Sequence, residues 1–116
     1  PTVLEGLPMR PRFCQAEAFG PVLSLHAFEN EADALAMAND SSYGLAASVW
    51  TSDIARAQRM AEGLETGIVW INAWMQRDLR TPFGGMKQSG FGREGGLEAI
   101  KFFSEVKTVS IGNPHV

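Results

Sequence analysis

Residues 67–72 read Gly-Ile-Val-Trp-Ile-Asn, a short run that is apolar throughout its middle. Such a run, bounded by glycine, is typical of a strand buried on both faces, as the strands of parallel sheets are. Upstream of it, residues 22–28 form a second apolar run that starts after Gly20-Pro21, and residues 46–51 form a third. We predict a strand for each of the three segments.

The segments between these strands have helical patterns. Asn30 is a good N-cap for a helix over residues 31–39, and Ser52 can cap a second helix over residues 53–64, whose apolar residues fall on one stripe. Strands that alternate with helices in this way favour parallel strands joined by right-handed crossovers. The predicted fold class is therefore α/β, with parallel strands and crossover helices.

The chain changes character after Asn72. Residues 73–93 are rich in glycine and have no clear period, and an irregular loop of that length inside a compact domain is usually functional. A helix is predicted for residues 94–103. Residues 105–111 then alternate between polar and apolar as an edge strand does.

The composition restricts the class of protein. The chain has 116 residues, a length typical of one domain, and its 10 Lys+Arg against 13 Asp+Glu give a net charge of −3. There is no broad basic surface for nucleic acid, no apolar run long enough for a membrane span, and no secretory signal at Pro1. The single cysteine, Cys14, fits a reducing compartment. We expect a cytoplasmic protein that binds neither nucleic acid nor membrane.

Several motifs have a structural and a chemical interpretation. Residues 90–95 match G-x-G-x-x-G, but no strand directly precedes them as a dinucleotide-binding turn requires, so a structural loop is favoured. Cys14 has no histidine beside it in the sequence, which favours a packing role, and no set of metal ligands is apparent. Arg77 and Arg80, flanked by Trp74 and Phe83, can form either a cationic pocket for an anionic substrate or a surface ion pair with Asp78. Spacing alone does not decide between the two.

Three motifs in order resemble the C-terminal part of the aldehyde dehydrogenase superfamily. They are Glu-Ala-Phe-Gly-Pro at 17–21, Asn-Asp-Ser-Ser-Tyr-Gly-Leu-Ala-Ala at 39–47, and the segment 82–94, which starts Pro-Phe-Gly-Gly. Arg-Asp-Leu-Arg-Thr at 77–81 resembles the members that act on 2-hydroxy- or 2-aminomuconate semialdehyde. The resemblance implies that residues 1–104 belong to a catalytic domain with its active-site loop at 73–93, and that residues 105–116 are an oligomerisation strand and tail.

The resemblance also implies roles for single residues. Glu17 is expected to bind the nicotinamide ribose of NAD, with Phe19 beside it, and NADP stays open. Arg77 is expected to hold a substrate carboxylate, with Trp74 and Phe83 lining the aldehyde pocket, and the strand 105–111 to pair with a second subunit as a homo-oligomer.

The family's nucleophilic cysteine, general base and Rossmann domain match nothing in this sequence, so we expect no catalytic residue and no metal site here, and a chain inactive by itself. A piece of a longer enzyme fits this pattern. The alternative is a non-enzymatic α/β module for binding or self-association.

Overall fold

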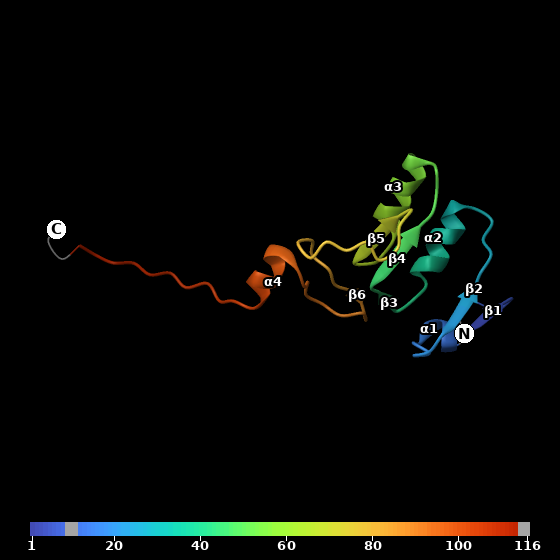
Figure 1. Ribbon diagram of the computed structural model, residues 1–116, viewed down its shortest axis with the longest axis horizontal. Coiled ribbons are helices and arrows are strands. Elements are labelled where there is room, and N and C mark those ends of the chain that lie inside the picture. The colour runs from blue at the N-terminus through green and yellow to red at the C-terminus, as the bar shows by residue number, and fades with distance from the viewer. Residues whose placement is uncertain (9–11, 114–116) are drawn as a thin grey trace.

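Short strands alternate with helices along the chain (Figure 1). The computed structural model describes residues 1–8 and 12–113. Its elements, in chain order, are β1 (Thr2–Glu5), α1 (Arg12–Gln15), β2 (Val22–Leu25), α2 (Glu31–Asn39), β3 (Tyr43–Gly44), β4 (Ala46–Val49), α3 (Ile54–Gly63), β5 (Ile68–Ile71), β6 (Met86–Lys87) and α4 (Gly96–Phe102).

The strands form pairs, and the two longer pairs are parallel. β4 and β5 run side by side from Ala46 opposite Ile68 to Val49 opposite Ile71, with α3 as the crossover between them. β1 and β2 pair in parallel from Thr2 opposite Val22. The predicted α/β class with parallel strands and helical crossovers is therefore confirmed. Within the described residues, however, β2 does not join β4, so the predicted strands do not make one continuous sheet.

The helix starts follow from their capping residues. Asn30 caps α2 as predicted, because its Oδ1 accepts a hydrogen bond of 3.0 Å from the backbone N–H of Asp33. The expected cap of α3 was wrong by one position. Asp53, not Ser52, is the N-cap, and its carboxylate accepts from the backbone N–H groups of Ala55 and Arg56 at 2.9 and 3.2 Å.

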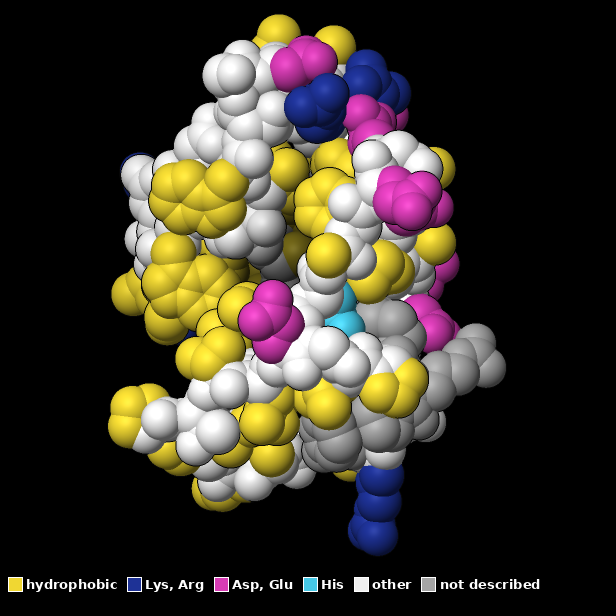
Figure 2. Space-filling view, turned by 90° about the vertical axis from the view of Figure 1, so that its right-hand side faces the viewer, with side chains coloured by type: hydrophobic (Ala, Val, Ile, Leu, Met, Phe, Trp, Pro, Cys, Tyr) yellow, Lys and Arg dark blue, Asp and Glu magenta, His cyan; other side chains and the backbone are white. Residues whose placement is uncertain are grey.

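Helix α3 and strand β5 supply most of the small core. Ala57, Met60, Leu64 and Trp70 are the buried hydrophobic residues among those described. Trp70 alone in β5 is buried, and the other three residues of the strand are half-buried, so the prediction of a strand buried on both faces is wrong for the described chain. Many other large apolar side chains stay at the surface, and Figure 2 shows them spread over one hollowed face. Apolar surface of this extent is typical of a surface that contacts protein, membrane or ligand.

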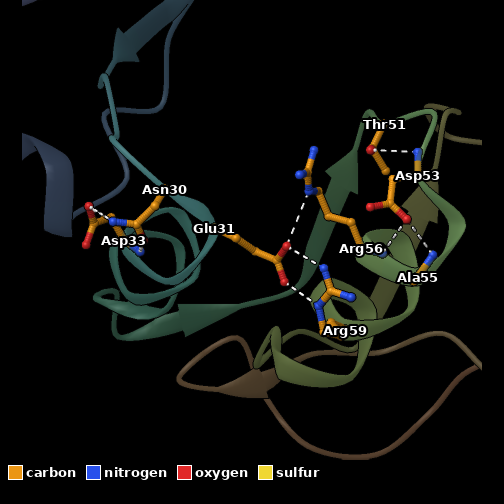
Figure 3. A network of polar contacts seen from close by, with 8 residues as sticks. All are labelled: Asn30, Glu31, Asp33, Thr51, Asp53, Ala55, Arg56 and Arg59. Carbon is orange, nitrogen blue, oxygen red and sulfur yellow. Dashed lines mark hydrogen bonds and ion pairs between the residues drawn. The ribbon is translucent and has the colours of Figure 1, made fainter.

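A polar network joins α2 to α3 (Figure 3). The Glu31 carboxylate accepts from Arg59 through Nε and Nη2, both at 2.7 Å, and from Arg56 Nε at 3.3 Å. The hydrogen bond from Arg59 and the charges of both arginines lower the pKa of Glu31 from 4.5 to about 2. Glu31 is therefore ionised at neutral pH and links the two helices at one end, while Asn39 at the end of α2 donates to the carbonyl of Gly63 in α3 at 2.8 Å.

The C-terminal segment differs from its prediction. Residues 105–111 form no strand, and the chain beyond α4 runs away from the other elements in an extended path (Figure 1). A strand needs a hydrogen-bonded neighbour, and none of the described residues pairs with this segment. The last part of the predicted tail, residues 114–116, lies outside the described residues. No helix among the described residues has the length and apolar character to cross a membrane.

Candidate functional site

The glycine-rich loop, residues 73–93, is fixed where it leaves β5. The Asn72 side chain binds the backbone of Thr51 twice: its Oδ1 accepts from the N–H at 2.9 Å, and its Nδ2 donates to the carbonyl at 2.8 Å. The indole Nε1 of Trp70 donates to the carbonyl of Gln76 at 2.8 Å. Since Trp70 belongs to the core, these bonds attach the start of the loop to the most buried part of the chain.

The second half of the loop is attached to the end of α2. Lys87 in β6 donates from Nζ to the carbonyls of Asn39 at 2.8 Å and Ser41 at 3.1 Å, and it forms an ion pair with Glu65 at 2.6 Å. A cation at the carbonyl end of a helix is favoured by the helix dipole. The Oγ of Ser89 also accepts from the backbone N–H of Gly44 at 2.9 Å. The loop 73–93, for which the sequence predicts no regular structure, is thus held at both ends by hydrogen bonds to the rest of the chain.

Arg77 lies between an aromatic ring and a carboxylate. Its guanidinium carbon is 4.5 Å from the centre of the Phe83 ring, a cation–π contact, and its Nη2 pairs with Oε1 of Glu94. Phe83 and Glu94 themselves form an antiparallel bridge, in which each backbone N–H donates to the other's carbonyl at 2.8 Å. The guanidinium of Arg77 therefore contacts two residues whose backbones are hydrogen-bonded to one another.

Arg80 has a different environment. It is the highly exposed partner of Asp78 in an ion pair two residues apart, with 89% of its side chain accessible against 39% for Arg77. The hydrogen bonds from Arg80 lower the pKa of the Asp78 carboxyl, and the same side-chain contact raises the pKa of Arg80. The sequence left a cationic pocket and a surface ion pair as alternatives for this segment. In the structure Arg80 forms the surface ion pair, whereas Arg77 lies against the apolar ring of Phe83.

Open hollows surround this arrangement. Arg77, Asp78 and Arg80 line one of about 820 Å³, whose floor includes Trp70 of the core. Phe83 and Glu94 line a neighbouring hollow of about 340 Å³ with Phe102 and other residues. Trp74 packs edge-on against Trp70 with 5.5 Å between ring centres, and 65% of it remains exposed.

Glu17 and Phe19 lie in another part of the chain, between α1 and β2. Both line a hollow of about 470 Å³ beside β1 and β2, and Phe19 is 91% exposed with a φ of 47°. Of residues 1–8 and 12–113, none lines both this hollow and that of Arg77, so the structure does not bring the expected cofactor and substrate residues into one pocket.

Glu94 and Cys14 have partners in the fold that their neighbours in the sequence do not indicate. Glu94 has no predicted role, because it belongs to a different motif from Arg77 and only the bridge to Phe83 brings it near. Cys14 has no histidine next to it in the sequence, but the fold places its Sγ 3.9 Å from Nε2 of His26 in a partly buried contact. Among the described residues no group of three His, Cys, Asp or Glu side chains lies close enough to hold a metal ion.

The sequence profile of the aldehyde dehydrogenase family matches residues 1–109. The chain belongs to the aldehyde dehydrogenase family. It is 46% identical over 111 residues to the 2-aminomuconic 6-semialdehyde dehydrogenase of a Pseudomonas species, and 47% identical over 111 residues to the 2-hydroxymuconic semialdehyde dehydrogenase of Pseudomonas sp. strain CF600. Each alignment covers 96% of this chain and 23% of the relative, so the chain spans less than a quarter of these aldehyde dehydrogenases.

Solved aldehyde dehydrogenase structures share the fold. Betaine aldehyde dehydrogenase from Staphylococcus aureus in complex with NAD+ superposes with a TM-score of 0.84 at 44% identity, covering 87% of this chain and 20% of that one. Indole-3-acetaldehyde dehydrogenase from P. syringae, in complex with NAD+ and IAA, gives a TM-score of 0.87 at 43% identity over 90% of this chain and 21% of that one. The likeness extends to family members with different substrates, so substrate choice must be argued from individual residues.

Proposed function

We propose that the protein containing this chain is an NAD-dependent aldehyde dehydrogenase that oxidises a carboxylate-bearing semialdehyde of the muconate type to the acid. The observation that carries the proposal is the guanidinium of Arg77, held between Phe83 and Glu94 beside an open hollow. The identity of 45–47% to several muconic semialdehyde dehydrogenases supports the same substrate class.

Arg77 has the chemistry that a substrate carboxylate needs. A guanidinium offers five N–H donors in a planar fork, and a charge-assisted pair of hydrogen bonds with a carboxylate sets both distance and orientation. Phe83 gives the guanidinium of Arg77 an apolar face, although its ring lines the neighbouring hollow and not that of Arg77, and the ring of Trp74 in the same loop is exposed. A linear semialdehyde with a charged end and an unsaturated carbon chain suits such a combination.

The cofactor-binding role belongs to Glu17 and Phe19. A carboxylate can accept hydrogen bonds from two neighbouring ribose hydroxyls, and an exposed aromatic ring beside it can cover a flat ring system. Both side chains line an open hollow, which fits a group that binds from outside, and the NAD+ complexes of related enzymes support NAD. When bound, NAD accepts the hydride of the aldehyde carbon. This chain's own part is to hold the ribose.

The extended segment 105–111 supports a homo-oligomer. Val106, Val109 and Ile111 are 99%, 71% and 90% exposed, and their backbone is not paired with any other described segment. An extended segment with unpaired backbone N–H and C=O groups can add as a strand to the sheet of another subunit. The lone cysteine supports a reducing compartment, and we propose the cytoplasm as the place of action.

The test of the substrate class compares Arg77→Ala with Arg80→Ala in the enzyme that contains this chain. Steady-state kinetics are measured with a carboxylate-bearing semialdehyde and with a neutral aldehyde of similar length. Arg77→Ala should raise KM for the charged substrate by roughly 10- to 100-fold, the range for hydrogen bonds to charged groups, and change that for the neutral one little. Arg80→Ala, the matched control, should change neither. Equal effects of Arg77→Ala on both aldehydes would contradict the proposal.

A further inference from the structure

Glu94 and Phe83, which lie opposite one another in the antiparallel bridge, both contact the guanidinium of Arg77. The residues of an antiparallel bridge lie directly opposite one another, and their side chains point to the same face. Here that face carries an aromatic ring and a carboxylate, and the guanidinium of Arg77 contacts both. The two contacts constrain the guanidinium in different ways. The Phe83 ring fixes the plane that the guanidinium lies against, and the Glu94 carboxylate fixes which N–H edge of the guanidinium faces residue 94.

An unconstrained arginine would bind a substrate less well. Its long side chain can adopt many rotamers, and binding a ligand must overcome the loss of that freedom. A guanidinium already held by protein contacts has lost part of that freedom before the substrate arrives, and preorganisation of this kind increases affinity. With Nη2 bonded to Glu94, the remaining N–H donors of Arg77 can meet a substrate carboxylate.

Glu94 also brings a negative charge near a site for an anion, which would weaken binding if it were buried. Its side chain is 62% exposed, however, and water screens the charge of an exposed group strongly. A hydrogen bond acts at contact distance and depends on its geometry, so solvent screening affects it less than it affects a charge further away. We therefore expect the orienting effect of Glu94 on Arg77 to exceed its repulsion of the substrate.

We propose that Glu94 is a positioning residue for substrate recognition: its carboxylate, next to the Phe83 ring, holds the Arg77 guanidinium in the orientation that binds the substrate carboxylate. This inference rests on the proposed function, in which Arg77 is the carboxylate ligand. Glu94 contacts Arg77 and need not touch the substrate itself.

The experiment is a double-mutant cycle in the enzyme that contains this chain, with the same two aldehydes. Glu94→Ala should raise KM for the carboxylate-bearing substrate about two- to tenfold, the range of one hydrogen bond, with kcat and the neutral aldehyde little changed. Glu94→Gln keeps an acceptor oxygen and should restore KM to near the wild-type value. In an Arg77→Ala background, Glu94→Ala should have no further effect on KM.

Glu98→Gln is the matched control, because Glu98 forms its own exposed ion pair with Lys101 one helical turn further on. Thermal unfolding of each variant shows whether it is folded, and if Glu94→Ala is not, Glu94→Asp, which is too short for the same contact, takes its place.

Three results would overturn the positioning role: a lower KM for the charged substrate in Glu94→Ala, a loss in kcat alone, or equal effects of Glu94→Ala with and without Arg77. The proposed function fails separately, if Arg77→Ala by itself does not discriminate between the two aldehydes.

Discussion

The backbone of Gly67, just before β5, lies directly against the carbonyl oxygen of Gly84 in the glycine-rich loop. A Cβ atom at residue 67 would be 1.6 Å from that oxygen, far inside van der Waals contact. The loop can therefore pass close to β5 only because residue 67 has no side chain.

Gly67→Ala should displace the loop or strain β5. Overpacking a well-packed site costs typically about 1–3 kcal/mol, and a clash with backbone leaves little room for relief. Denaturant unfolding of the protein that contains this chain measures the loss. Gly112→Ala is the control, since a Cβ there meets nothing within 4 Å. Equal stability of the two variants would show that the loop does not pack on β5 as described.

Glu31→Gln should remove a pH-dependent part of the stability. Because the folded pKa of Glu31 is lowered from 4.5 to about 2, its contribution is complete above pH 4.5 and is lost as the pH falls to about 2. The unfolding temperatures of wild type and variant should thus differ at pH 6 and converge toward pH 2. Glu62→Gln removes an exposed carboxylate that accepts from Gln58 within α3, and it serves as the control. A constant difference across this pH range would rule out the ion pair as its source.

Glu17→Ala should weaken NAD binding selectively. Two hydrogen bonds from ribose hydroxyls to a carboxylate are charge-assisted, so their loss should raise the KM for NAD by roughly 10- to 100-fold without changing the KM for the aldehyde. Glu29→Ala is the control, since it removes another exposed carboxylate, one that lines a different hollow. If both variants bind NAD like the wild type, Glu17 is not the ribose ligand.

Deletion of residues 105–113 should reduce the number of subunits in the assembly. The segment makes no sheet contact within the described chain, so its removal leaves the other elements intact while taking away the apolar side chains offered to a neighbour. Light scattering of the protein that contains this chain gives the mass of the assembly, and circular dichroism checks the fold. An unchanged mass would place the oligomer interface elsewhere.

Local signals predicted the elements that are fixed locally. The bounds of α2 agree with the predicted helix over residues 31–39, because Asn30 supplies a cap and the following residues are good helix formers. β4, α3 and β5 begin and end within two residues of their predicted bounds for similar reasons. β1, β3 and β6 were not predicted, since each is short and is a strand only because a partner distant in the sequence pairs with it.

In the candidate site, too, local sequence indicated some features, and others depend on residues distant in the chain. Two arginines among aromatic residues left a cationic pocket and a surface ion pair as alternatives, and it was the resemblance to the family, not the spacing, that singled out Arg77 from Arg80. Their environments differ because the chain turns back at Phe83 and brings Glu94 to one of them only. The contact of Cys14 with His26 has the same origin, since the turn between α1 and β2 is what brings the two side chains together.

The Phe83–Glu94 bridge has a consequence for how this loop can vary. The residue opposite Phe83 is set by the number of residues between them, so a chain that keeps the bridge but gains one residue within 84–93 would put Arg93 in the place of Glu94. A guanidinium would then face Arg77 in place of a carboxylate, and loss of one residue would put Gly95 there. The length of this segment thus determines the charge beside Arg77 as much as the identity of residue 94 does.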